Sequence, residues 1–189
     1  MKTAKLLFAI LLIITSTALS AKELKVNTDK SNIHWVGKKI GGEHSGDIKL
    51  KIAILEIEAD VLRKGEFVID MNSMTNTDIE NLEYREKLMG HLKSDEFFGT
   101  ETFPIAILKV STEARFNQGT AKVNADLMIK GQTYPISFNV IKRDGNYYAT
   151  LEIDRSKYDI RYGSRSFFDN LGDKAIHDNF TLEIVLVID

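Results

Sequence analysis

The chain has 189 residues, of which 25 are lysine or arginine and 27 are aspartate or glutamate, and its formal charge at neutral pH is −2. No block of basic residues occurs, so the positive surface that binds a nucleic-acid backbone is missing. Cysteine is absent as well, which excludes disulfide bonds and the lipidated cysteine of a bacterial lipoprotein, and leaves stability to the core.

The first twenty residues have the three regions of a secretory signal peptide. Lys2 and Lys5 are positive, residues 6–14 are an unbroken apolar run, and residues 15–21 are mostly small or polar. The apolar run is about half as long as the roughly 20 residues that cross a bilayer as a helix, which favours a cleaved signal over an anchor. We predict cleavage after Ser20. Residues 21–189 then form one soluble domain, periplasmic or secreted, with the formal charge changed from −2 to −4 by the loss of the two lysines.

Short stretches in which apolar and polar residues alternate follow the signal, as is typical of strands with one face in a core. The first candidates are residues 33–38, 44–50, 52–59 and 67–71.

Residues 77–93 interrupt this pattern and predict one amphipathic helix. Apolar residues recur there near helical spacing: Ile79, Leu82, Leu88, Met89 and Leu92. Thr77 or Asp78 can cap the start of this helix, and Gly90 predicts an irregular end.

Residues 120–154 have the clearest strand pattern. Three alternating runs are separated by Gly131 and by a turn at residues 143–146, which predicts a three-stranded antiparallel meander. The last run, residues 180–189, is apolar on nearly both faces. Eight or nine strands with a single helix predict a mainly β protein: an antiparallel β-barrel of about eight strands flanked by one amphipathic α-helix, or alternatively a two-sheet sandwich.

Several motifs occur in a characteristic order. They are Trp35-x-Gly37, Gly41-x-x-His44-x-Gly46, Gly65-x-Phe67-x-Ile69-Asp70-Met71 with Asp78, His91-Leu92-Lys93-Ser94-Asp95-Glu96-Phe97-Phe98 before Pro104, Leu127-Met128-Ile129-Lys130-Gly131-Gln132-Thr133, and Asp154-Arg155-Ser156-Lys157-Tyr158 with Tyr162-Gly163-Ser164. In this combination the chain resembles the YceI-like family over residues 24–189. One departure is Gly99, which stands where the family usually has an aspartate and alters the hydrogen bonds expected there.

The resemblance implies a lipocalin-like barrel whose apolar interior holds a polyisoprenoid, such as an isoprenoid quinone or prenol, or another long-chain lipid in the periplasm. It also implies a binding protein that is not an enzyme, with an expected link to envelope stress. A structural or interaction protein of the envelope with a solid core is the alternative. Whether two barrels pair as a homodimer stays open.

The alternation selects the side chains that we expect to line such a cavity, several of which are small and leave room. They are Ala106, Leu108, Val110, Val123, Ala125, Leu127, Ile136, Phe138, Val140, Ala149, Leu151 and Ile153. A barrel of about eight strands holds either side chains alone or one small ligand.

A cluster of basic and aromatic residues follows the strand that ends at residue 154. Arg155, Tyr158, Arg161 and Tyr162 can hold an anionic or hydroxylated head group at a barrel mouth, or they can pin a loop through salt bridges and aromatic packing.

Metal binding and catalysis receive little support from the sequence. The four histidines fit no compact metal motif, and His44 and His91 are expected to fix a turn and a helix end. No thiol is present, and no serine lies in a Gly-x-Ser-x-Gly setting. An enzyme acting through a metal or on an isoprenoid would need at least three His and carboxylate side chains to converge. We therefore expect no catalytic residues, cofactor or metal.

Overall fold

The computed structural model describes residues 22–189, and the predicted signal peptide, residues 1–20, lies outside the described residues. The strands are β1 (Lys22–Leu24), β2 (Val26–Lys39), β3 (Gly42–Glu58), β4 (Val61–Asp70), β5 (Ile105–Val110), β6 (Ala114–Arg115), β7 (Thr120–Ile129), β8 (Gln132–Arg143), β9 (Asn146–Asp154) and β10 (Ile176–Ile188). The helices are α1 (Leu82–Lys93) and the 3-10 turns η1 (Met71–Ser73), η2 (Arg155–Tyr158) and η3 (Gly172–Lys174). Across residues 22–189, no helix has the length and apolar content needed to cross a membrane.

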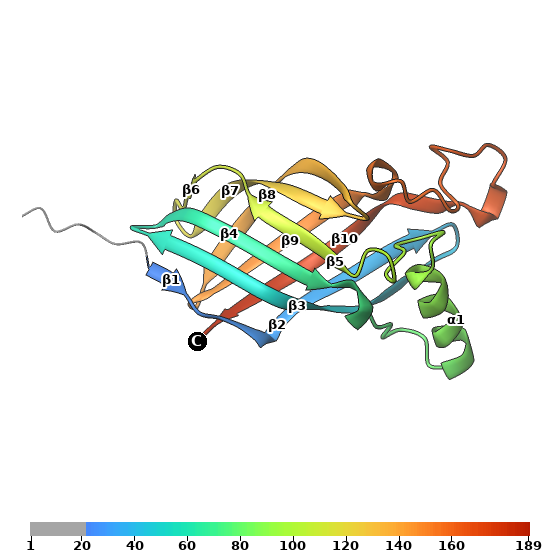
Figure 1. The fold of residues 1–189 in the computed structure, drawn as a ribbon, viewed down its shortest axis with the longest axis horizontal. Helices are drawn as coiled ribbons and strands as arrows, with labels where there is room; N and C mark the ends of the chain where they lie inside the picture. The colour runs from blue at the N-terminus through green and yellow to red at the C-terminus, as the bar shows by residue number, and fades with distance from the viewer. Residues whose placement is uncertain (1–21) are drawn as a thin grey trace, which may run out of the picture.

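Eight of the strands close into an antiparallel barrel (Figure 1). Their order is β3-β2-β10-β9-β8-β7-β5-β4, and β4 pairs back with β3. The short strands β1 and β6 extend this sheet at the edges of β3 and β4. Closure through the β3–β4 pairing confirms the predicted barrel and excludes the sandwich.

The predicted meander is formed by β7, β8 and β9. In β7 every second residue from Ala121 to Ile129 is buried and the polar residues between them are exposed, as the alternation requires. Lys130-Gly131 and Asp144-Gly145 join the strands with positive φ at both central residues, 49° and 74° in the first pair and 51° and 79° in the second. Such two-residue turns match the twist of the strands that they connect.

The two strands predicted at residues 44–50 and 52–59 are one long strand, β3. Its pairing with β4 shifts register between Leu50 and Ile52, so Lys51 is an extra residue in the ladder. The shift turns Ile52 outward, where it is 49% exposed, and points Leu55 into the core.

Helix α1 starts later than predicted. Asn81, and not Thr77 or Asp78, caps it: the Asn81 side chain accepts a hydrogen bond from the Tyr84 N–H at 3.1 Å. The earlier start is wrong because residues 75–77 run along β3. The Thr75 and Thr77 N–H groups donate to the carbonyls of Asp47 and Ser45, at 2.9 and 3.0 Å. Gly90 lies inside the helix, which ends at Lys93, and the N–H of the next residue, Ser94, is shared between the carbonyls of Gly90 and His91.

The barrel has two different ends. The mouth end comprises the β2–β3 turn, the β4–β5 connection with α1, the β7–β8 turn and the β9–β10 connection, and it lies on the right in Figure 1. The far end comprises the β3–β4 turn, the β5–β7 connection, the β8–β9 turn and the C-terminus. A small core cluster lies at the far end, where the rings of Phe116 and Tyr147 lie 5.7 Å apart, and several of its members also line the cavity described below.

A candidate ligand cavity inside the barrel

A cavity of about 370 Å³ lies inside the barrel. All eight barrel strands contribute aliphatic or aromatic side chains to its wall, among them Ile33, Leu50, Leu108 and Leu182. A dry apolar cavity of about 150 Å³ can hold benzene, so about 370 Å³ accommodates an apolar chain of roughly fifteen carbon atoms. The volume also falls within the range of ordinary small-molecule sites, roughly 300–1,000 Å³.

Nine of the twelve side chains selected from the sequence line this cavity. They are Ala106, Leu108, Val110, Val123, Leu127, Phe138, Val140, Ala149 and Leu151. Ala125, Ile136 and Ile153 do not line it. Ala125 and Ile153 are 1% and 2% exposed and are covered by the core cluster around the cavity, against which Ile136 packs from β8.

Other parts of the cavity wall were not among the predicted residues. β2, β3, β4 and β10 supply, for example, Ile33, Leu55, Phe67 and Phe180. In β10 both faces are apolar, so the alternation does not select a face, and in β3 the bulge at Lys51 changes the inward face midway. Periodicity alone therefore could not identify them.

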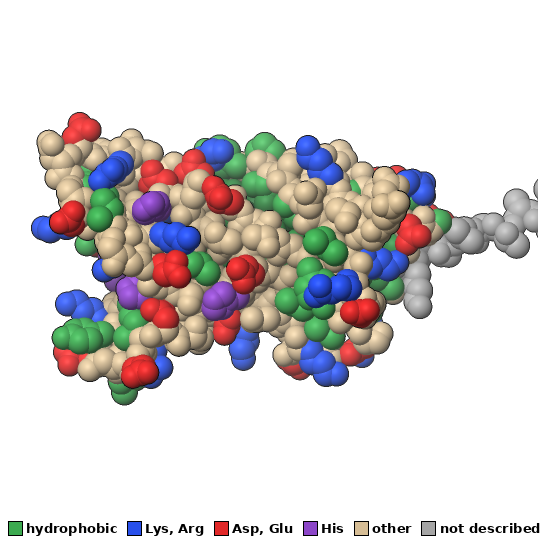
Figure 2. All heavy atoms as spheres, turned by 180° about the vertical axis from the view of Figure 1, so that it is seen from behind, with side chains coloured by type: hydrophobic (Ala, Val, Ile, Leu, Met, Phe, Trp, Pro, Cys, Tyr) green, Lys and Arg blue, Asp and Glu red, His purple; other side chains and the backbone are tan. Residues whose placement is uncertain are grey.

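The mouth of the cavity lies among α1, the β2–β3 hairpin and the β9–β10 connection. Five residues border both the cavity and an outer depression: Lys39, His44, Leu88, His91 and Tyr162. Figure 2 shows this end of the molecule on the left, as two projections with a hollow between them. None of the α1 residues is fully buried, although Leu88 and Leu92 reach the cavity. The helix therefore covers the mouth through a few partly buried side chains.

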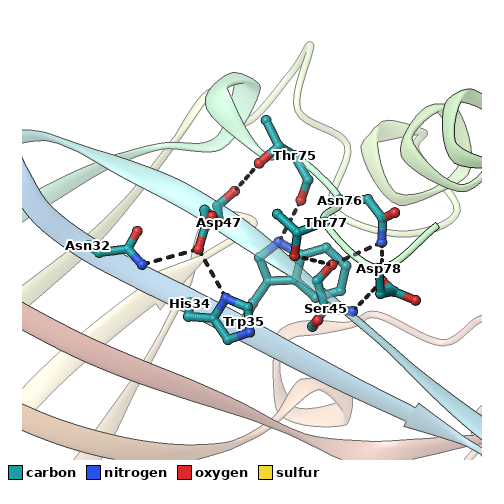
Figure 3. A network of polar contacts seen from close by, with 9 residues as sticks. All are labelled: Asn32, His34, Trp35, Ser45, Asp47, Thr75, Asn76, Thr77 and Asp78. Carbon is teal, nitrogen blue, oxygen red and sulfur yellow. Dashed lines mark hydrogen bonds and ion pairs between the residues drawn. The ribbon is translucent and has the colours of Figure 1, made fainter. Parts of the chain in front are cut away.

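Residues 75–78, which we call the strap, attach this helix to the barrel (Figure 3). The Trp35 indole N–H donates to the Thr75 carbonyl at 3.0 Å. The Asp78 carboxylate accepts the Ser45 N–H at 2.8 Å and lies 2.8 Å from Nδ1 of His44. The widely spaced motif residues Trp35, His44 and Asp78 thus meet at one attachment point.

The charge of Asp78 is favoured at this point. Partial burial raises the pKa of its carboxyl group, but hydrogen bonds from the Ser45 N–H, His44 and Asn76 outweigh burial and hold the pKa below its ordinary value. A second histidine, His34, lies 3.0 Å from the carboxylate of Asp47, the residue whose backbone carbonyl accepts the Thr75 N–H. The ionised Asp78 carboxylate therefore helps to hold the strap on β3.

Arg155 borders the cavity, but its donors are already used. The guanidinium is 2% exposed, and its N–H groups reach the backbone carbonyls of Ile160, Tyr162, Ile176 and His177 at 2.9–3.3 Å. The Asp178 carboxylate lies 3.4 Å from Nη2. Burial lowers the pKa of Arg155, and Asp178 and Asp154 oppose that shift. Four of the five N–H groups donate to backbone carbonyls and Nη2 also faces Asp178, so Arg155 pins the β9–β10 connection and is not free to hold a head group.

The other three predicted head-group residues have separate positions. Tyr158 is 1% exposed, packs edge-on against Tyr134 with 5.4 Å between ring centroids, and does not reach the cavity. Burial raises the pKa of Tyr158 to about 12. Arg161 is exposed, pairs with Asp159 and does not line the cavity either. Tyr162 does reach the mouth, where its ring meets that of His91 at 4.3 Å.

Metal ligands do not gather around the cavity. Among residues 22–189, no three His, Asp or Glu side chains converge closely enough to hold a metal ion. His91 packs between the rings of Tyr162 and Phe97, while His44 is held by Asp78.

An eight-stranded antiparallel barrel around an apolar cavity, with one helix at its mouth, places the chain among the lipocalin-like barrels. More narrowly, the chain belongs to the YceI-like family: the model of the YceI-like domain matches residues 24–188. This match confirms the resemblance inferred from the sequence motifs. None of the curated proteins matches the chain.

Solved structures share the fold at low sequence identity. Burkholderia cenocepacia BcnA is 20% identical with a TM-score of 0.68, over 86% of this chain and 98% of that one. A polyisoprenoid binding domain from Saccharophagus degradans, implicated in plant cell wall breakdown, is 17% identical with a TM-score of 0.57, over 87% and 96%. The Campylobacter jejuni YCEI protein is 16% identical with a TM-score of 0.54, over 100% and 99%.

Proposed function

We propose that this chain is an exported, soluble binding protein that carries a polyisoprenoid or another long-chain amphiphilic lipid in its barrel. The observation that carries the proposal is the cavity of about 370 Å³, which is walled by apolar side chains and opens at one end of the barrel. Its family membership and the polyisoprenoid-binding neighbour support the same ligand class.

The energetics of burial fit such a ligand. Transfer of about fifteen carbon atoms from water into the cavity contributes roughly 12 kcal/mol, at about 0.8 kcal/mol per carbon, before association and ordering costs. Those costs take back a large part of this gain. Because the barrel strands preform the cavity, most of the ordering falls on the ligand. Apolar burial alone then gives useful affinity, and a polar end group can stay at the mouth.

The proposal assigns no reaction to the protein, because the groups around the cavity interior are mainly aliphatic and aromatic. It also places the protein outside the inner membrane, based on the signal features of residues 1–20. An apolar interior that shields its ligand from water is useful there, since a long-chain lipid cannot cross an aqueous compartment unaided. A link to envelope stress would follow if loading changes when membranes are damaged.

The alternative is a structural or interaction protein with a solid interior, and the cavity weighs against it. The test is native mass spectrometry of protein expressed from the full chain and purified without detergent, followed by organic extraction. We expect a bound long-chain species and cleavage near Ser20. Apo protein that takes up neither isoprenoid quinones nor long-chain lipids would rule out the carrier.

A further inference from the structure

Exposed large hydrophobic side chains gather at the mouth end of the barrel. Within residues 22–189 nine such residues are exposed, and seven of them lie at this end: Ile40, Leu82, Tyr84, Tyr134, Tyr162, Phe167 and Phe168. The other two, Ile52 and Ile141, lie on the barrel wall in β3 and β8. Scattered exposed hydrophobic residues are normal in soluble proteins, but their concentration around one opening indicates an interaction surface.

The most exposed of these side chains lie on the two projections that flank the mouth. Leu82 and Tyr84 in the first turn of α1 are 58% and 63% exposed. Phe167 and Phe168 in the β9–β10 connection are 40% and 48% exposed. Figures 1 and 2 show both projections extending from the same end of the barrel, and Figure 2 shows a hollow between them.

The chemistry of the β9–β10 projection suits a lipid headgroup layer. Aromatic rings with polar or cationic neighbours are favoured at membrane interfaces, and Arg161 lies 5.1 Å from the Phe167 ring centroid. Residues 157–174 carry four basic and three acidic side chains, so an anionic headgroup surface is not repelled there. A protein partner would favour one continuous apolar core, whereas here the hydrophobic residues stand on two separate projections.

We propose that the mouth end docks on a bilayer surface by inserting the two hydrophobic tips, residues 82–84 and 167–168, on either side of the cavity opening. The role of this docking in lipid transfer rests on the proposed function, whereas the docking itself does not. A lipid that leaves a bilayer through water does so roughly fourfold more slowly for every methylene group that becomes exposed. When the mouth is held against the headgroups, the lipid can enter the cavity without that exposure to water.

Vesicle binding tests the docking directly. Protein expressed from the full chain, with its N-terminus defined by mass spectrometry, is sedimented with phosphatidylcholine vesicles with and without phosphatidylglycerol. The matched variants are Phe167→Ser with Phe168→Ser, Leu82→Ser with Tyr84→Ser, and, as the control, Ile52→Ser with Ile141→Ser. The control residues are both 49% exposed but lie away from the mouth. We expect each mouth pair to lower vesicle affinity about tenfold and the control pair by less than about twofold.

A second readout separates docking from lipid binding. cis-Parinaric acid, a fluorescent long-chain amphiphile, is offered either from ethanol or from preloaded vesicles. The variant with Phe167→Ser and Phe168→Ser should take up the probe from ethanol as fast as the wild type. From preloaded vesicles its uptake should be slower than that of the wild type. No uptake by any variant would overturn the carrier function while the sedimentation result still decides the docking. Equal vesicle binding by all variants, no binding by the wild type, or self-association that only the mouth variants abolish would overturn the docking.

Discussion

A Cβ atom on Gly46 would lie 1.9 Å from the carbonyl oxygen of Thr75, so the strap can follow β3 only where residue 46 has no side chain. The same oxygen accepts the Trp35 indole N–H at 3.0 Å. The strap in turn leads directly into α1, which covers the mouth. The attachment of the helix that covers the cavity thus depends on a glycine in β3.

Replacing Gly46 with alanine should therefore displace the strap. We expect Gly46→Ala to lower the free energy of unfolding by about 1–3 kcal/mol, as overpacking does elsewhere, and to speed ligand release. Urea unfolding and probe-displacement kinetics measure these effects. The matched control is Gly37→Ala, because a Cβ at Gly37 meets nothing within 4 Å. Equal effects of the two substitutions would contradict the proposed attachment.

The strap should also respond to acid. Because the folded-state pKa of Asp78 is lowered, its contribution to stability is complete above the unfolded pKa, near 3.9, and is lost as the pH falls through the folded-state value. Asp78→Asn should lower the free energy of unfolding by about 1 kcal/mol at neutral pH. Urea unfolding of the wild type and the variant at a series of pH values measures the difference between their free energies of unfolding. This difference should narrow below about pH 4. A difference that stays constant down to pH 3 would show that the Asp78 charge is not responsible.

The sequence predicted the meander and most of its cavity-facing residues because β7, β8 and β9 alternate without interruption. Where the orientation of a residue depends on how distant strands pair, the sequence alone could not predict it. Ile52 faces outward because β3 gains one residue relative to β4, and only the pairing register reveals that bulge.

The role of Arg155 was similarly hidden in the sequence. The motif suggested either a head-group contact or a pinned loop, and these alternatives differ only in where the donors point. Four carbonyls from a segment that folds back over the guanidinium decide between them. The strap could not be predicted either, because Thr75 and Gly46 are far apart in sequence and Asp78 is an equally good helix cap.

Arg155→Lys should loosen the β9–β10 connection. Lysine keeps the charge opposite Asp178 but offers three donors and no planar fork, so several carbonyls lose their partner. We expect a loss of about 2–3 kcal/mol in the free energy of unfolding and faster hydrogen exchange across residues 160–176. Arg161→Lys is the control, because Arg161 pairs with Asp159 at the surface, where exchange of one cation for another changes stability by less than about 1 kcal/mol. Comparable effects of the two changes would refute the pinning role.

Filling the cavity should remove ligand uptake without unfolding the barrel. Ala149 lines the cavity from β9, so the ring in Ala149→Phe occupies space that the ligand needs. We expect uptake of cis-parinaric acid to fall at least about tenfold, since most of the affinity comes from buried apolar carbons. Thr150→Phe adds a ring on the exposed face of the same strand and should leave uptake unchanged. Fluorescence titration with circular dichroism on each variant measures both effects. Wild-type uptake by a folded Ala149→Phe protein would mean that the ligand binds elsewhere, because the cavity at this level would no longer admit it.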